Sequence, residues 1–208
     1  MPDIEAVVFD IGNVLIGWNP ERYYDSVIGE NCRKQLFAEV DLHCMNERVD
    51  LGADFMRTIY ETADQNPDWR DQIRQWHDNW IELAGPVIEH TVRLLRALRI
   101  NRVPVFALSN FGIGSFAVAE KEFPFLGEFD QRYISGHMGV VKPGPEIYRM
   151  LERECGVASG RLLFVDDRPE NIAAAEARGW QAHLFEGAQG WADRLVAEEL
   201  LIVAEAAA

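Results

Sequence analysis

The chain has 208 residues, a length that suits one sizeable core and a modest insertion. Hydrophobic residues make up 48% of it, and 34 Asp and Glu against 20 Lys and Arg give a net charge of −14. This composition is that of a globular protein and not a disordered one. The acidic charge argues against nucleic acid and anionic lipid as partners, and no apolar run reaches the roughly 18 residues of a membrane span.

The cysteines and the N-terminus indicate the compartment. Cys32, Cys44 and Cys155 are odd in number and show no CxxC spacing, as is usual for free thiols. The acidic N-terminus runs directly into a strand-like segment, which is not typical of a signal peptide. We therefore expect a reduced, cytoplasmic protein with buried thiols, present as a monomer or a homodimer.

The first predicted element is a buried strand over residues 5–9, which ends at Asp10. From about residue 20 to 85 the apolar residues recur instead at helical spacing, with helices expected over 54–64 and 68–83. No convincing strand is expected in this stretch. The pattern predicts an all-helical insertion of roughly 65 residues.

After the insertion, strands and helices alternate to the end of the chain. The expected strands cover 103–108, 132–134, 161–165 and 181–184, and the expected helices cover 87–98, 113–121, 145–155, 169–178 and 191–201. This succession predicts an α/β fold, with a parallel sheet and helices on both of its faces.

Four short polar clusters each follow an apolar, strand-like run. They are Asp10 with Gly12-Asn13, Ser109-Asn110, Lys142-Pro143 and Asp166-Asp167. The carboxyl ends of the strands form the binding crevice of an open α/β sheet, so we expect these side chains to converge. Such a combination suits covalent chemistry on an anionic substrate with a divalent metal.

Each cluster also has a simpler interpretation. Asp10 could cap a turn, and Lys142 could be a surface lysine. Ser109 and Asn110 are ordinary N-cap residues, although a polar loop that opens a helix also presents backbone N–H groups to a phosphate. The Asp166-Asp167 pair could be a turn and a cap; alternatively, because adjacent carboxylates repel each other, it could hold a hard cation such as Mg²⁺.

Taken together and in this order, the clusters resemble the motifs of the haloacid dehalogenase-like (HAD) superfamily. The matching stretches are Val-Val-Phe-Asp10-Ile-Gly12-Asn-Val-Leu, Ala-Leu-Ser109-Asn110, Val-Val-Lys142-Pro-Gly-Pro-Glu-Ile-Tyr and Leu-Phe-Val-Asp166-Asp167-Arg-Pro-Glu-Asn171-Ile. The resemblance covers nearly the whole chain. It implies a three-layer α/β/α Rossmann-like core formed by 1–16 and 86–208, with a helical cap domain, 17–85, inserted after the first strand.

The resemblance implies a role for each catalytic residue of a phosphoric monoester hydrolase. Asp10 would attack phosphorus and form an aspartyl-phosphate. Ser109 and the Asn110 amide would hold the phosphoryl oxygens, and Lys142 would link Asp10 to the phosphoryl group and offset charge in the transition state.

The resemblance also implies a metal site. Mg²⁺ would be bound by the side chains of Asp10 and Asp167 and by the main-chain carbonyl of Gly12. Asp166 would lie close by or act through a water molecule.

Gly12 departs from the family pattern. Most family phosphatases have a second Asp at this position, two residues after the nucleophile, which serves as acid and base. The carbonyl ligand is retained, but the proton donor for the leaving alkoxide is lost, and that role is worth roughly 10²–10⁴-fold in rate. The enzyme could be slow, could use water or a cap residue, or could prefer good leaving groups. The pattern resembles a branch that includes phosphatases of α-D-glucose 1-phosphate, whose anomeric phosphate has a comparatively good leaving group.

The favoured function is therefore a Mg²⁺-dependent phosphatase of small phosphorylated metabolites, with sugar phosphates first. Arg22, Arg48 and Trp18 are candidates for substrate contacts near the mouth of the site. One alternative is a metal-independent 2-haloacid dehalogenase, against which the Asp166-Asp167 pair argues. Another, motivated by Gly12, is a binding protein that keeps the HAD fold without catalysis.

Overall fold

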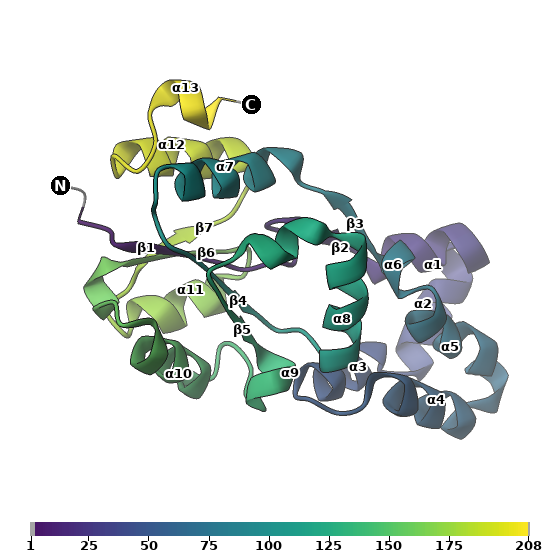
Figure 1. Cartoon of the computed structure of the whole chain (residues 1–208). Coiled ribbons are helices and arrows are strands. Elements are labelled where there is room, and N and C mark those ends of the chain that lie inside the picture. Colours follow the sequence, from purple (N-terminus) through teal and green to yellow (C-terminus); the bar gives the residue numbers. More distant parts are fainter. Residues whose placement is uncertain (1–2, 208) are drawn as a thin grey trace.

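A parallel sheet of five strands forms the centre of the computed structural model, which describes residues 3–207 (Figure 1). The strand order is β5-β4-β1-β6-β7. The strands are β1 (Ala6–Phe9), β4 (Val105–Ser109), β5 (Gln131–Ile134), β6 (Leu162–Asp166) and β7 (Gln181–Leu184). β1 lies in the middle, with Val7 in register with Val105 of β4 and Leu163 of β6. After β1 the chain adds β4 and β5 on one side of it and then β6 and β7 on the other side. Open α/β sheets bind their ligands at such a point, where the strand order reverses.

Helices cover both faces of this sheet. α7 (Glu89–Ile100) and α12 (Ala188–Ala197) lie on one face, and α10 (Pro145–Cys155) and α11 (Pro169–Glu176) lie on the other (Figure 1). Alternate residues of β1 point to opposite faces of the sheet. Phe9 therefore packs in the hydrophobic core beneath α7 and α12, and Val8 packs in the core beneath α10 and α11. The predicted three-layer α/β/α fold is confirmed.

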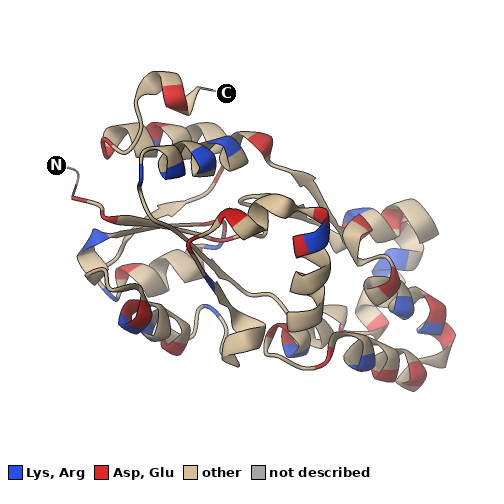
Figure 2. Cartoon of the chain, viewed as in Figure 1, with Lys and Arg blue, Asp and Glu red and all other residues tan. Residues whose placement is uncertain are grey.

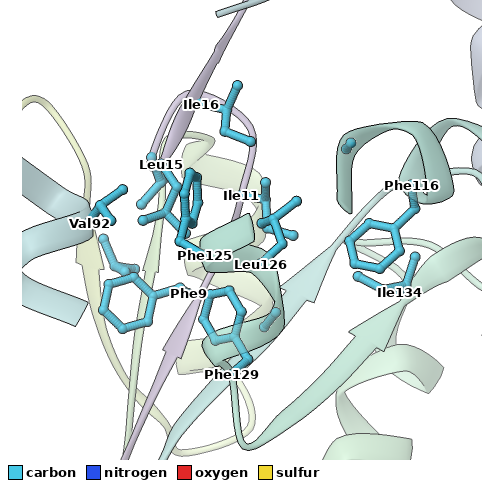
Figure 3. Packing of buried hydrophobic residues seen from close by; sticks show 14 of the residues in the cluster. Phe9, Ile11, Leu15, Ile16, Val92, Phe116, Phe125, Leu126, Phe129 and Ile134 are labelled. Carbon is cyan, nitrogen blue, oxygen red and sulfur yellow. The ribbon is translucent and has the colours of Figure 1, made fainter. Parts of the chain in front are cut away.

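Aromatic packing holds the end of β1 in place. The ring of Phe9 lies 6.1 Å from that of Phe129 and meets Trp191 edge-on at 5.7 Å. Figure 3 shows Phe9 and Phe129 beside Ile11 and Leu15, which belong to the turn after the strand. Because these residues flank position 10 on both sides, the backbone that carries Asp10 is anchored in the core.

A group of helices lies beyond one end of the sheet (Figure 1). It begins after β2 (Ile16–Trp18) and ends at β3 (Ala84–Val87), and these two strands pair antiparallel. We call residues 19–83 the helical insertion. Its helices are α1 (Pro20–Ile28), α2 (Glu30–Glu39), α3 (Leu42–Asp50), α4 (Phe55–Gln65), α5 (Arg70–Asp78) and α6 (Trp80–Leu83), with a 3₁₀ turn η1 (Pro67–Trp69). The other short elements are α8 (Ile113–Glu122), η2 (Pro124–Glu128), α9 (Ser135–Met138), η3 (Ser159–Arg161) and α13 (Val203–Ala206).

Several local expectations were wrong. Val87 belongs to β3, although a helix was expected to begin there, and α7 starts at Glu89. The pair of β2 and β3 was not expected, because strands of three and four residues are too short to show alternation. The helix expected over 68–83 is broken at Asn79 into α5 and α6. Cys32 and Cys44 are exposed and not buried.

Charge is spread over the whole molecule. Figure 2 shows acidic residues on the helices of the insertion and on those around the sheet.

Within residues 3–207, no helix combines the length and the apolar character that crossing a bilayer requires.

Candidate active site

Asp10 lies directly after β1, and only one of its two carboxylate oxygens accepts hydrogen bonds among the described residues. Its backbone N–H continues the sheet by donating to the carbonyl of Val165 (2.9 Å). Oδ1 accepts from the N–H of Ile11 (2.7 Å), from Ser109 Oγ (2.7 Å) and from Lys142 Nζ (2.9 Å). In the described part of the chain, no hydrogen bond reaches Oδ2. One oxygen is thus fixed while the other is available to attack an electrophile or to bind a cation.

Lys142 lies between two carboxylates and is only 3% exposed, which rules out the alternative of a surface lysine. Its Nζ is 2.9 Å from Asp10 Oδ1 and 2.6 Å from Asp166 Oδ2. Burial alone would lower the pKa of Lys142, but the attraction of Asp10 and Asp166 outweighs it and raises that pKa. The Asn110 side chain braces this lysine by donating to its carbonyl (2.9 Å) and accepting from its N–H (2.8 Å). The structure therefore holds a charged ammonium beside Asp10.

The two aspartates after β6 differ in their surroundings. Asp166 is fully buried, and its carboxylate accepts from Lys142 Nζ and twice from Asn171 Nδ2 (2.9 and 3.0 Å). Asp167 is half-buried, and its Oδ2 accepts from Asn13 Nδ2 (2.9 Å). The contacts of Asp166 already occupy both of its oxygens, whereas Asp167 retains more capacity to bind a ligand.

Three carboxylates form a potential metal centre. Oxygens of Asp10, Asp166 and Asp167 lie within 4.8 Å of one another. Burial raises the pKa of Asp10 to about 7, with Asp166 adding to the rise and Lys142 opposing it. Burial and Asp166 also raise the pKa of Asp167. Three carboxylates surround a single lysine here, so their oxygen donors fit a hard divalent cation that would add positive charge.

A cavity of about 640 Å³ opens onto these groups. On the sheet side its lining includes Asp10, Gly12, Asn13, Ser109, Asn110, Phe111, Lys142, Asp167, Arg168 and Asn171. The predicted convergence of the strand-end residues is therefore present in the structure. Asn13 belongs to the first of these clusters but was given no role of its own, and its contact with Asp167 spans 154 residues of sequence.

The insertion contributes lining residues that the sequence analysis did not identify. They are Pro20 and Glu21 of α1, His43, Asn46, Glu47 and Asp50 of α3, Leu51 just after it, and Trp80 of α6. The four residues of α3 share one face of that helix, because their spacing follows its period. This spacing was the available signal, but it does not reveal what the face lines.

Comparison with known proteins identifies the family. A sequence profile for haloacid dehalogenase-like hydrolases matches residues 4–179, which include all the strand-end site residues. The chain belongs to the haloacid dehalogenase-like hydrolase family.

This HAD-like hydrolase is similar to two curated phosphatases. The sesquiterpene phosphatase astK of Aspergillus oryzae is 25% identical over 189 residues, which cover 84% of this chain and 86% of that protein. The D-ribitol-5-phosphate phosphatase of Bacteroides thetaiotaomicron is 22% identical over 205 residues, which cover 92% of this chain and 97% of that protein.

A solved HAD family enzyme from Bacteroides thetaiotaomicron shares the fold. It superposes with a TM-score of 0.75 at 21% identity, over 92% of this chain and 98% of that one. Its wild-type complex with magnesium and inorganic phosphate superposes with a TM-score of 0.68 at 22% identity, over 88% and 95% of the two chains.

Two residues of the HAD-like hydrolase that were predicted to bind substrate lie outside the cavity lining. Arg22 donates from Nη2 to the carbonyl of Gly85 (2.7 Å), and Arg48 donates from Nη2 to Thr62 Oγ1 (3.0 Å). Trp18, the third candidate near the mouth, does line the cavity. Arg22 and Arg48 are therefore not placed to contact a molecule bound in this cavity.

Proposed function

We propose that this HAD-like hydrolase is a Mg²⁺-dependent phosphatase of small phosphorylated metabolites, with sugar phosphates favoured, that acts through an aspartyl-phosphate. The observation that carries the proposal is the buried Lys142, 2.9 Å from Asp10 and 2.6 Å from Asp166, beside Asp167. Phosphoryl transfer depends mainly on positioning and on neutralising charge, and this arrangement supplies both.

The chemistry follows from the free oxygen of Asp10. Its Oδ2 attacks phosphorus and the bond from phosphorus to the ester oxygen breaks, while Ser109 and Lys142 hold Oδ1 in a fixed orientation. Water then hydrolyses the aspartyl-phosphate, which releases inorganic phosphate and restores the Asp10 carboxylate. The ammonium of Lys142 offsets the charge that develops on the phosphoryl oxygens. The backbone N–H of Asn110 accompanies it as a donor, since within residues 3–207 it has no other hydrogen bond.

The proposed metal ligands are Asp10, the carbonyl of Gly12 and Asp167, with Asp166 in the layer behind them. When bound, Mg²⁺ supplies positive charge beside the nucleophile and the transferring phosphoryl group. The magnesium and phosphate complex of the Bacteroides thetaiotaomicron enzyme supports this choice of ion. A metal-independent dehalogenase would leave the carboxylate cluster without a compensating cation.

The proposed domain division places a cap, residues 17–85, over a core formed by 1–16 and 86–208. The pairing of β2 with β3 supports it, because the chain leaves the core and returns to it through this short antiparallel pair. The lining residues of α1, α3 and α6 support a role for the cap in choosing the substrate.

Gly12 argues for substrates with a good leaving group. A carboxylic acid at this position would donate a proton to the departing oxygen, and glycine cannot. A sugar 1-phosphate releases an anomeric hydroxyl, which needs that proton less than a primary alcohol does.

Phosphate release from p-nitrophenyl phosphate tests the proposal, with Mg²⁺ and with excess EDTA. We expect turnover only with Mg²⁺, loss of turnover in Asp10→Asn, and retention of beryllofluoride by the wild type but not by this variant. Turnover that survives EDTA or the Asp10→Asn substitution would contradict the proposal.

A further inference from the structure

One face of α3 forms an acidic wall opposite the catalytic residues. Glu47 and Asp50 lie on this face together with His43 and Asn46, and Glu21 of α1 joins them in the cavity lining. The neighbouring face of α3 is buried through Leu42, Met45 and Val49. We call Glu21, Glu47 and Asp50 the acidic wall.

The acidic wall is held at a fixed place relative to the sheet. Ser135 Oγ donates to the carbonyl of Asp50 (2.6 Å) and accepts from the N–H of Phe111 (2.8 Å), so it joins α3 to the loop after β4. Just beyond α3, Gly52 lies so close to the sheet side that a Cβ there would be 2.7 Å from the carbonyl oxygen of Gly136. Such backbone contacts leave the wall little freedom to move away from the site.

Little positive charge balances the acidic wall. Lys142 is committed to Asp10 and Asp166, and Arg168 is 2.6 Å from Glu170. His43 Nε2 is 3.2 Å from Glu21, where it offsets charge only when protonated. The insertion places no lysine or arginine in the cavity lining, so far as residues 3–207 show.

The pKa of Asp50 is raised by burial and by the neighbouring carboxylates. Burial raises the pKa of Asp50 to about 7, and Glu47 and Asp10 add to that rise, against hydrogen bonds from the Gly112 N–H and Asn46. Asn46 Nδ2 donates to Asp50 Oδ2 at 2.9 Å. A further anion placed beside Glu47 and Asp50 would meet repulsion with no cation of the insertion to offset it.

The wall faces a cavity that also contains aromatic rings. Trp18, Trp80 and Phe111 line it, with centroids 5.7 Å apart for the first pair and 5.4 Å apart for Trp80 and Phe111. Carboxylates accept strong, charge-assisted hydrogen bonds from hydroxyl groups, and aromatic faces pack against C–H surfaces. A polyhydroxylated group satisfies both, whereas an apolar group would desolvate the carboxylates without compensation.

We propose that the acidic wall selects phosphorylated substrates whose leaving portion is uncharged and rich in hydroxyl groups, and rejects those that carry a second anionic group there. This inference rests on the proposed phosphatase function and narrows its substrate class. It assigns specificity to Glu47 and Asp50, because a free phosphate or carboxylate on the leaving portion would lie against them.

Two matched pairs of substrates test the inference with Mg²⁺ present. Glucose 1-phosphate and glucose 1,6-bisphosphate share the anomeric leaving group and differ in a second phosphate. Sorbitol 6-phosphate and n-hexyl phosphate share a primary alkoxide and differ in hydroxyl groups. We expect kcat/KM to be at least about tenfold higher for the first member of each pair, a ratio that corresponds to about 1.4 kcal/mol. Equal values within either pair overturn the inference.

Charge variants test the assignment to particular residues. In Glu47→Gln, and more strongly in Glu47→Lys, we expect the preference for glucose 1-phosphate over the bisphosphate to shrink by about tenfold or more. Glu61→Gln is the matched control, since Glu61 is an exposed residue of α4 outside the cavity lining, and it should leave the preference unchanged. An unchanged preference in both Glu47 variants overturns the assignment.

The substrate p-nitrophenyl phosphate separates the two proposals. If the wild type does not hydrolyse it with Mg²⁺, the phosphatase function fails and the substrate class fails with it. If the wild type hydrolyses it but does not discriminate within the matched pairs, only the substrate class fails.

Discussion

Replacing Asp10, the proposed nucleophile, should make the metal-free protein more stable as well as inactive. Asp10 is 6% exposed, and its pKa is raised from 3.8 to about 7. At about 1.4 kcal/mol per pH unit, ionising this carboxyl in the folded protein costs roughly 4 kcal/mol more than in the unfolded chain. Asp10→Asn removes that cost and retains an oxygen that can accept from Ser109 and Lys142.

The pH dependence identifies the cause. The stability that a neutral Asp10 contributes is fully present below pH 3.8 and is lost as the pH rises through about 7. The advantage of Asp10→Asn should therefore be greatest near pH 8, at up to roughly 4 kcal/mol, fall to about 1–2 kcal/mol at pH 5 and vanish below pH 4. For a chain of this length, the gain at pH 8 corresponds to a rise in Tm of about 8–16 °C.

Thermal unfolding in EDTA across this pH range is the assay. Asp193→Asn, at an exposed position of α12, is the matched control and should change Tm little. With Mg²⁺ at about 100 times its Kd, the wild type should gain about 2.7 kcal/mol and the variant less, so the difference between them narrows. An Asp10→Asn variant no more stable than Asp193→Asn at pH 8 in EDTA would refute the reasoning.

Two further substitutions test the site and its walls. Gly12→Asp should leave Mg²⁺ affinity unchanged, because the carbonyl remains and a Cβ meets nothing within 4 Å, and it should speed release of poor leaving groups by up to roughly 10²-fold; a weaker response of Tm to Mg²⁺ would count against the carbonyl ligand. Gly52→Ala should cost about 1–3 kcal/mol and raise KM for glucose 1-phosphate, since φ is +103° and the new Cβ would lie 2.7 Å from the Gly136 oxygen. Gly29→Ala, where φ is +81° and a Cβ meets nothing within 4 Å, should lower Tm but leave KM unchanged, and a raised KM there would show that contact with the sheet side is not the cause.

Much of the fold was predictable because its signals are local. The apolar run in residues 5–9 predicted a buried strand, and the observed strand, Ala6–Phe9, is buried throughout in the centre of the sheet. The errors in predicting secondary structure occurred where an element is too short to show its hydrophobic period. Strands β2 and β3 are too brief for alternation to show, and they pair across the whole insertion.

Part of the candidate site could likewise be predicted from the sequence, and part could not. The polar residues that end strands were found from sequence, because parallel strands bring their carboxyl ends to one edge of the sheet and the backbone alone decides that placement. The side-chain partners were not found in this way. Arg22 and Arg48 bind Gly85 and Thr62, contacts that depend on how the helices of the insertion pack together.

The sequence by itself determined the α/β succession and the type and order of the residues around Asp10. Only the tertiary structure decided that Lys142 would be buried between two carboxylates and that Glu47 and Asp50 would face the cavity. The physical reason is that periodicity specifies which residues share a face of a helix, whereas the surface that this face meets depends on contacts between distant parts of the chain.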